Sequence, residues 1–185
     1  MKTLICLVGM SGAGKRLAWF SIVRRGIPVI ELGYFVRIEM RRRGLAQNPD
    51  NENLVATDLR REEGEAAVAK RAIKRLISMK NPIIGIEWFR SIAEVEELKK
   101  YFEKTIVISV IASRKTRLIR SLRRNRKDCH QDEASFMRRE KREIDNGIEE
   151  VVALADYPLL NEGSEGEFNR KMKKLLDEIL PNLKS

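Results

Sequence analysis

The sequence predicts an α/β protein built on a parallel β-sheet with helices on both faces. Five short apolar segments carry the strand signal, and helical patterns fill the stretches between them. This alternation is typical of parallel sheets, because parallel strands need long crossover connections. Residues 4–8 are continuously apolar, which indicates a strand that is buried on both faces.

The elements follow one another along the chain in a regular order. The expected strands are residues 3–8, 27–30, 83–87, 105–111 and 157–160. Ser91 with Glu94, and Ser164 with Glu167, have the spacing of a helix capping box. The last helix has an apolar stripe at helical spacing, formed by Phe168, Met172, Leu175, Leu176 and Ile179.

The chain of 185 residues is expected to form a single domain, residues 1–185. Two stretches interrupt the alternation of strands and helices. Residues 33–79 are mostly helical in pattern and too long for one simple crossover, and residues 114–154 are dense in arginine. Insertions of this kind lie at the carboxyl ends of the strands, where ligands bind. We therefore expect both stretches to close over substrates.

The composition indicates a protein whose surface attracts anionic molecules. The net charge is +10, which favours nucleotides, nucleic acid or acidic lipid headgroups, or simply forms a solvated surface. No apolar run is long enough to span a membrane, so we expect a cytoplasmic protein without a membrane partner. Cys6, Cys129 and His130 do not have zinc-ligand spacing, and no metal ligands are assigned.

A phosphate-binding pattern, G-x-x-x-x-G-K, is matched by the consecutive residues Gly9, Met10, Ser11, Gly12, Ala13, Gly14 and Lys15. The glycines allow a tight loop whose N–H groups converge on phosphate oxygens, at the N-terminus of a helix. The lysine would reach the β- and γ-phosphates. The pattern follows an apolar strand and precedes a helical pattern, which predicts that it binds a nucleoside triphosphate, most notably ATP. The alternative is an ordinary glycine-rich strand–helix turn.

The position after the lysine departs from the pattern. A serine or threonine hydroxyl there normally binds Mg²⁺, but this chain has Arg16, which has no lone pair for a cation. Three hypotheses stay open. Mg²⁺ is held by other groups and water, or catalysis is impaired, or Arg16 itself contacts phosphate and partly replaces the charge of the metal.

Charged residues beyond this loop suggest phosphoryl transfer. Glu87 ends the third expected strand, where a carboxylate can hold the water shell of a metal or orient an acceptor hydroxyl; the alternative is a surface glutamate. Arg90 would point toward an acceptor phosphate. The arginines of residues 114–154 suit the stabilisation of a transferring phosphoryl group, or form a basic helix surface or an RNA-binding face.

Several stretches resemble an archaeal family of adenylate-kinase-related, dephospho-CoA-kinase-like P-loop proteins whose substrate is uncertain. The more specific ones are Arg-Ser-Ile-Ala-Glu-Val-Glu at residues 90–96 and Ala-Asp-Tyr-Pro-Leu-Leu-Asn-Glu at residues 155–162. The resemblance covers nearly the whole chain. Arg16, Tyr34 and the Glu87-Trp88 pair depart from the family, which usually has Ser or Thr, Asp, and Asp-Gly at these positions.

The resemblance implies a P-loop fold of the nucleoside-monophosphate-kinase type, with a five-stranded parallel core. Residues 33–79 would then be an acceptor-binding helical insertion, and residues 114–154 an arginine-rich lid. Residues 12–16 would form the donor phosphate site. The further implied site residues are Arg37, Arg60 and Arg90 for the acceptor phosphate, Arg120, Arg124 and Arg139 in the lid, and Asn161 in the loop near the adenine.

These observations together predict an ATP-dependent phosphotransferase that acts on a small nucleotide or a nucleotide-containing metabolite, with Mg²⁺ in doubt because of Arg16. The expected catalytic residues are Lys15, Glu87, Arg120, Arg124 and Arg139. The first alternative is a catalytically impaired nucleotide sensor. The second is a nucleic-acid-associated NTPase, which is less favoured because Phe136 is the only aromatic residue between Arg114 and Arg142. The sequence does not indicate an oligomeric state.

Overall fold

The fold is a parallel sheet between two layers of helices, as predicted. A computed structural model describes residues 2–123 and 132–183 of the chain. Within these residues the sheet has five strands, all parallel, in the order β2-β3-β1-β4-β5. The strands are β1 (Thr3–Val8), β2 (Val29–Glu31), β3 (Ile83–Glu87), β4 (Lys104–Ile111) and β5 (Tyr157–Leu160).

The strand bounds agree closely with the sequence prediction except at β2. The prediction began this strand at Ile27, whereas it begins at Val29. Pro28 has no N–H group to donate to a sheet ladder, and its carbonyl instead accepts a hydrogen bond from Gly85 N at 2.8 Å. The strand therefore starts after the proline and places Glu31 opposite Glu87 at the carboxyl edge of the sheet.

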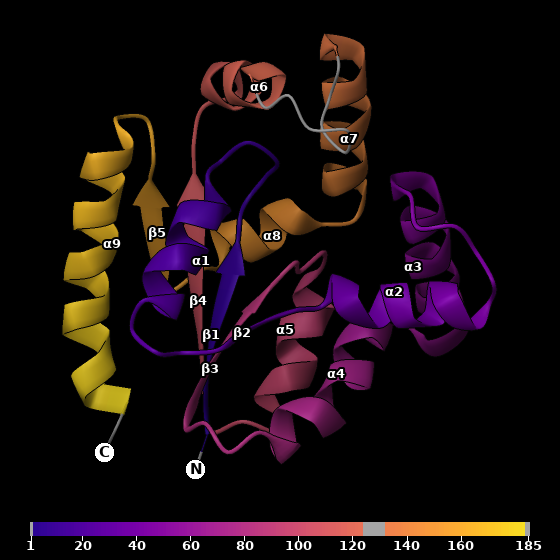
Figure 1. Ribbon diagram of the computed structural model, residues 1–185, viewed down its shortest axis with the longest axis horizontal. Helices are drawn as coiled ribbons and strands as arrows, with labels where there is room; N and C mark the ends of the chain where they lie inside the picture. Colours follow the sequence, from indigo (N-terminus) through magenta and orange to yellow (C-terminus); the bar gives the residue numbers. More distant parts are fainter. Residues whose placement is uncertain (1, 124–131, 184–185) are drawn as a thin grey trace.

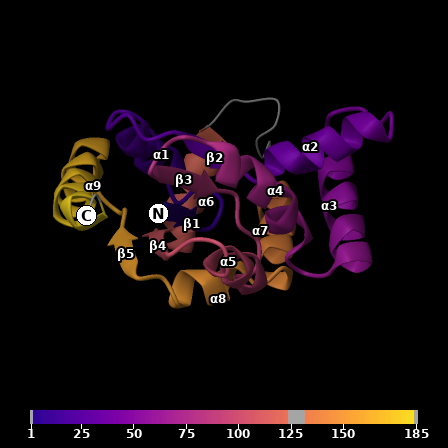
Figure 2. The same ribbon diagram turned by 90° about the horizontal axis from the view of Figure 1, so that it is seen from below.

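Helices cover both faces of the sheet (Figures 1 and 2). One layer contains α1 and α9, and the other contains α4, α5 and α8. The helices are α1 (Lys15–Val23), α2 (Gly33–Arg42), α3 (Pro49–Glu63), α4 (Ala67–Ser78), α5 (Ile92–Lys99), α6 (Arg114–Arg123), α7 (Glu133–Asp145), α8 (Ile148–Ala153) and α9 (Glu165–Ile179), followed by the 3₁₀ turn η1 (Leu180–Leu183).

The central strand β1 explains why the core has two halves. Its side chains alternate between the two faces of the sheet. Leu4 and Cys6 pack with the layer that holds α4 and α5, whereas Ile5 and Leu7 pack with α1 and α9. All of them are completely buried, as the uninterrupted apolar run predicts.

The two predicted capping boxes have different outcomes. Ser164 and Glu167 form the reciprocal pair at the start of α9, which confirms that box. The box at Ser91 is wrong: Ser91 is the N-cap of α5, but its hydroxyl is buried and has no partner in the described part of the chain. Glu94 instead accepts a hydrogen bond from Arg90 N at 2.7 Å, and its carboxylate also forms an ion pair with Arg60.

Helices of the two long insertions surround the carboxyl ends of the strands. Residues 33–79 contain α2, α3 and α4, and α2 and α3 extend away from the sheet on the side opposite α9 (Figure 1). The helices α6 and α7 lie above the carboxyl ends of the strands in the same view. Across residues 2–123 and 132–183, no helix is both long and apolar enough to cross a membrane.

Candidate active site

The glycine-rich loop joins the carboxyl end of β1 to α1. Gly14 is the N-cap of α1 and has a φ of 104°, and Gly12 has a φ of 82°. Residues with a side chain rarely adopt this left-handed backbone, so the glycines permit the tight turn that leads into the first turn of the helix. Because the strand neighbours of β1 are β3 and β4, the loop lies at the centre of the sheet edge.

Lys15 folds back over this loop. Its Nζ donates hydrogen bonds to the carbonyl oxygens of Gly9 and Met10. Desolvation lowers the pKa of Lys15 to about 8, although the charge of Glu143 acts in the opposite direction. The lysine is thus held at the loop that it is expected to serve, with a proton that is less tightly bound than on a free lysine.

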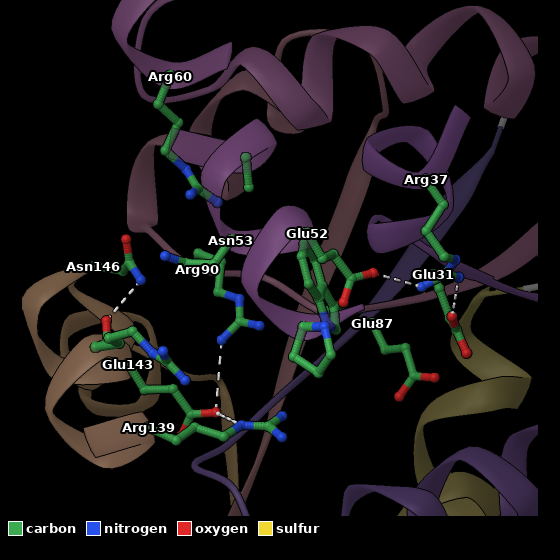
Figure 3. A pocket seen from close by; sticks show the side chains of 14 residues that line it. Glu31, Arg37, Glu52, Asn53, Arg60, Glu87, Arg90, Arg139, Glu143 and Asn146 are labelled. Carbon is green, nitrogen blue, oxygen red and sulfur yellow. Dashed lines mark hydrogen bonds and ion pairs between the residues drawn. The ribbon is translucent and has the colours of Figure 1, made fainter. Parts of the chain in front are cut away.

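A carboxylate from α7 sits on the loop. The Oε2 atom of Glu143 accepts a hydrogen bond from Ser11 N at 2.8 Å, and its Oε1 atom accepts one from Ser11 Oγ at 2.6 Å. The same Oε1 lies 3.3 Å from Arg139 Nε and 3.6 Å from Arg90 Nη1. Figure 3 shows the two arginines that face this carboxylate, and with Ser11 the donors on one buried anion come from three separate segments.

The electrostatics of Glu143 show how strongly these groups favour a negative charge. Burial raises its pKa, but Lys15, Arg139, Arg90 and the hydrogen bond from Ser11 outweigh burial and bring the pKa down to about 2. A backbone N–H, a hydroxyl and three cations are also the groups that bind phosphoryl oxygens in proteins. The carboxylate occupies a position suited to a phosphoryl group.

Glu143→Gln is expected to tighten the binding of ATP, because the nucleotide then no longer competes with a carboxylate for these donors. The gain should be about tenfold, or ~1.4 kcal/mol, for ATP and smaller for ADP. Isothermal titration with both nucleotides measures it. Glu140→Gln is the matched control, since Glu140 lies on the same helix but pairs with Arg114 and Arg117. Equal gains in both variants would show that α7 has loosened, not that an anion has been removed.

A polar cavity of about 300 Å³ opens beside the loop (Figure 3). It brings together side chains from β2, α2, α3, the end of β3 and α7. Five of the residues predicted from the sequence line it: Arg37, Arg60, Glu87, Arg90 and Arg139. The further charged residues of its wall are Glu31, Glu52, Arg142 and Glu143.

Two of the cavity arginines are held by carboxylates. Arg37 bridges β2 and α3 through ion pairs to Glu31 at 2.6 Å and Glu52 at 3.0 Å. Arg60 is buried and pairs with the fully buried Glu94 at 3.4 Å, and its Nε has no hydrogen-bond partner among the described residues. Ion pairs with these carboxylates hold both arginine side chains in place, so their positions are set before any ligand binds.

Arg90 is positioned by an aromatic residue. Its guanidinium lies 4.3 Å from the centre of the Trp88 ring. Trp88 has a φ of 80°, a left-handed conformation that favours glycine, and the resemblance places glycine at this position. A residue that keeps such a backbone conformation beside a binding site usually serves the geometry of that site. Trp88 supports Arg90 at the mouth of the loop.

Glu87 has a different environment from the other carboxylates of the cavity. It ends β3, opposite Leu7 of β1 and Glu31 of β2. Its side chain makes no hydrogen bond or ion pair within residues 2–123 and 132–183, and in Figure 3 no dashed line joins it to the other residues drawn. Burial, and then the charge of Glu31, raise its pKa to about 7 against the charge of Lys15.

The other predicted residues lie outside the cavity. Asn161 is buried behind the loop and donates from Nδ2 to Ala13 O at 2.8 Å, and Arg120 donates to Asn161 O at 2.8 Å. Arg16 is exposed, with its guanidinium 5.2 Å from the centre of the Phe20 ring. Tyr34, a departure from the family pattern, is exposed as well. The predicted lid residue Arg124 lies outside the described residues.

The sequence analysis missed Glu143, the residue that lies on the loop. It also missed the pair Glu31 and Glu52, whereas Arg142 belongs to the arginine-dense stretch that it singled out. The spacing of Arg139 and Glu143, four residues apart on an expected helix, predicts an ion pair between them. It does not indicate that the pair would lie over Ser11, 132 positions away along the chain.

Among the described residues, no group of three His, Cys, Asp or Glu side chains is arranged to hold a metal ion. Arg16 supplies no oxygen, and its side chain turns toward Phe20.

Proteins of similar sequence are found in archaea. A UPF0200 protein of Pyrococcus horikoshii is 39% identical over 183 residues, which cover 97% of this chain and 98% of that protein. A UPF0200 protein of Hyperthermus butylicus is 37% identical over 178 residues, with 96% and 95% covered. One of Methanothermobacter thermautotrophicus is 35% identical over 176 residues, with 95% and 90% covered. No protein-family model matches the chain.

Solved structures of similar fold include P-loop kinases. The protein TT1252 of Thermus thermophilus has a TM-score of 0.67 at 19% identity, with 96% of this chain and 97% of that chain covered. A gluconokinase of Sinorhizobium meliloti has a TM-score of 0.60 at 14% identity, with 98% of this chain and 95% of that chain covered. A shikimate kinase of Acinetobacter baumannii, in complex with shikimate, has a TM-score of 0.56 at 19% identity. The match covers 98% of this chain and 95% of that chain. The chain shares the kinase-like α/β fold of these proteins.

Proposed function

The chain belongs to the UPF0200 family, and from this premise we propose that it binds ATP at residues 9–15 and transfers the γ-phosphoryl group to a small molecule in the adjoining cavity. The acceptor is a nucleotide or a nucleotide-containing metabolite. The observation that carries the proposal is the convergence of donors on the Glu143 carboxylate, at the point where the loop and the arginine-lined cavity meet.

Each part of this arrangement has a role in phosphoryl transfer. The loop N–H groups and Lys15 neutralise the donor phosphates. Arg90 and Arg139 stabilise the charge that spreads over the equatorial oxygens of the transferring group. Transfer is expected to be direct and in line, without a covalent protein intermediate, because catalysis of phosphoryl transfer works by positioning and charge stabilisation. The kinase-like fold of the chain supports this assignment.

The proposal is tested by a thermal-shift screen of nucleotides, each with and without Mg²⁺. A nucleotide that binds only the folded chain, at a hundredfold excess over its Kd, raises the apparent stability by about 2.7 kcal/mol. ATP and ADP are expected to stabilise the protein, and labelled γ-phosphate is expected to appear in an acceptor. No stabilisation by any nucleoside triphosphate would contradict the proposal.

The second candidate function is a nucleotide sensor that binds ATP without transferring phosphate. Arg16 favours it, because this residue stands where a hydroxyl usually helps to hold Mg²⁺. In such a protein, ATP binds with similar affinity with and without Mg²⁺. Arg16→Ser is then expected to make binding depend on Mg²⁺ and to raise any transfer rate, measured by titration and by a coupled ADP assay. Brisk wild-type transfer that Arg16→Ser leaves unchanged would exclude the sensor.

A further inference from the structure

Carboxylates and cations are distributed unevenly around the cavity (Figure 3). Glu31 and Glu87 lie on one side with Arg37. Arg60, Arg90 and Arg139 lie on the other, and Arg142 also lines the wall. Glu143 lies on the second side, paired with Arg90 and Arg139, so a ligand that fills this space meets the carboxylate of Glu87 at one end and an excess of cations at the other.

At the acidic end, Glu87 alone is free to act on a ligand. Arg37 holds both Glu31 and Glu52 in ion pairs. The carboxylate of Glu87, by contrast, has no hydrogen bond or ion pair within the described ranges, and it lies at the sheet edge beside the strand that leads into the phosphate-binding loop. An unpartnered carboxylate facing a cavity is suited to accept a proton or a hydrogen bond from a ligand.

At the basic end, two arginines have donors left for a ligand. Arg60 lines the cavity, and among its nitrogens only Nη2 is paired within the described residues, with Glu94 at 3.4 Å. Arg142 makes no side-chain hydrogen bond or ion pair within those residues. Arg90 and Arg139 face Glu143 and the loop, so a phosphoryl group of the donor would use them. Arg60 and Arg142 remain for an anionic group of the acceptor.

We infer that the acceptor is a small anion that presents an alcohol hydroxyl to Glu87 and a carboxylate or phosphate to Arg60 and Arg142. This inference rests on the proposed function and names the atom that receives the phosphoryl group. A ribose or other alcohol oxygen accepts it, not a phosphate oxygen.

The transfer step balances with the groups present. Glu87 accepts the proton of the hydroxyl while the hydroxyl oxygen forms a bond to the γ-phosphorus. The bond from the γ-phosphorus to the bridging oxygen breaks, and its electron pair stays on the β-phosphate of ADP. The products are a phosphate monoester, ADP and a protonated Glu87, which then releases its proton to water.

A phosphate oxygen as the acceptor does not fit this environment. An ionised phosphate has no proton for Glu87 to remove, and its negative charge would lie beside Glu87 and Glu31. A hydroxyl carries no charge and needs a base, since its proton must leave. The groups that act on Glu87 from the neighbouring elements are Glu31 of β2 and Lys15 of α1.

Product analysis tests the inference on acceptors of several chemical classes. Wild-type protein and ATP are incubated with AMP, GMP, CMP and UMP, and with glycerate, gluconate, glycerol 3-phosphate and ribose 5-phosphate. ³¹P NMR then separates phosphate monoesters from phosphoanhydrides. We expect a new monoester. A new anhydride, such as ADP formed from AMP, would overturn the inference and leave the proposed function standing. No transfer to any of these probes would count against both.

Glu87 variants provide the second test. Glu87→Gln is expected to slow transfer by about 10²–10⁴-fold while ATP affinity is unchanged. Glu87→Asp keeps a carboxylate and is expected to retain part of the rate. In wild type and Glu87→Asp, kcat/KM should rise with pH as the carboxylate ionises near neutrality, and in Glu87→Gln this rise should be absent. Transfer that Glu87→Gln leaves unchanged, with the same pH profile, would refute the role.

The anion contact is tested on α7. Arg142→Gln is expected to raise the KM of the acceptor about tenfold with little change in kcat, since a charge-assisted contact is lost. Arg138→Gln is the matched control, because Arg138 is exposed on the same helix and does not line the cavity. Equal effects of the two substitutions would overturn the contact. A wild-type protein that does not bind ATP would instead refute the proposed function.

Discussion

Lys15→Ala is expected to weaken ATP binding by about 3 kcal/mol, or about a hundredfold in Kd. The lysine is held at the loop by the carbonyl oxygens of Gly9 and Met10, and it is the cation that the loop brings to the donor phosphates. Isothermal titration with ATP on both proteins measures the loss. Lys173→Ala, which removes an exposed lysine of α9, is the control and should bind ATP as wild type does.

The same variant should fold at least as well as wild type. Desolvation lowers the pKa of Lys15 from 10.5 to about 8, so the folded chain binds this proton less tightly than the unfolded chain does. Between about pH 8 and 10.5 the unfolded chain therefore holds more protons, and this group makes the free energy of unfolding rise with pH. Urea unfolding across this range should show the rise in wild type and not in Lys15→Ala. A variant that is unfolded at pH 7 would show that the binding loss has another cause.

Gly12→Ala is expected to lower the free energy of unfolding by about 2–5 kcal/mol, from left-handed strain and overpacking together. Gly12 has a φ of 82°, and a Cβ atom added there would lie 2.5 Å from Arg117 O and 2.9 Å from Arg117 Cα. Both are backbone atoms of α6, which cannot rotate away as a side-chain atom can. The whole helix α6 would therefore have to shift away from the loop. Urea unfolding of the variant measures the cost.

Gly26→Ala separates the two contributions. Gly26 has a φ of 75°, and a Cβ atom added there would meet nothing within 4 Å. Its cost should be the left-handed strain alone, about 1–2 kcal/mol. An equal cost at Gly12 and Gly26 would show that α6 does not rest on the loop in solution. A larger cost at Gly12 would support the close packing of the two segments.

The strands of the sheet follow from local sequence because burial on both faces demands apolar residues at every position. Residues 4–8 are apolar throughout and residues 83–86 are apolar apart from Gly85, and the strands that contain them begin and end where the sequence predicts. The second strand does not, since Ile27 and Pro28 are apolar but lie before the ladder. An apolar run indicates a buried segment, whereas the hydrogen-bonded ladder of a sheet also needs backbone N–H donors, which proline lacks.

The tight glycine-rich loop at residues 9–15 was also predictable from the sequence, because its backbone geometry requires glycines within seven consecutive residues. Several of the residues implied by the family resemblance, among them Arg37, Arg60 and Arg90, were brought together with Glu87 by the ends of β2 and β3 and the helices that follow them. Parallel strands place their carboxyl ends at one edge, which explains why Glu87 and Arg90 lie near the residues that follow β2, whereas Arg37 and Arg60 were expected at the site only from the family resemblance.

The sequence by itself thus determined the α/β class, the position of the loop and the basic character of its surroundings, since each depends on residue type and local spacing. Only the tertiary structure decided that Glu143 lies on Ser11, that the hydroxyl of the N-cap residue Ser91 makes no capping hydrogen bond, and that Glu87 is left without a partner among the described residues. These outcomes depend on how α7, α3 and β3 pack against one another. Helical spacing determines the face of the helix on which a side chain lies, but the packing of whole elements determines which residues that side chain contacts.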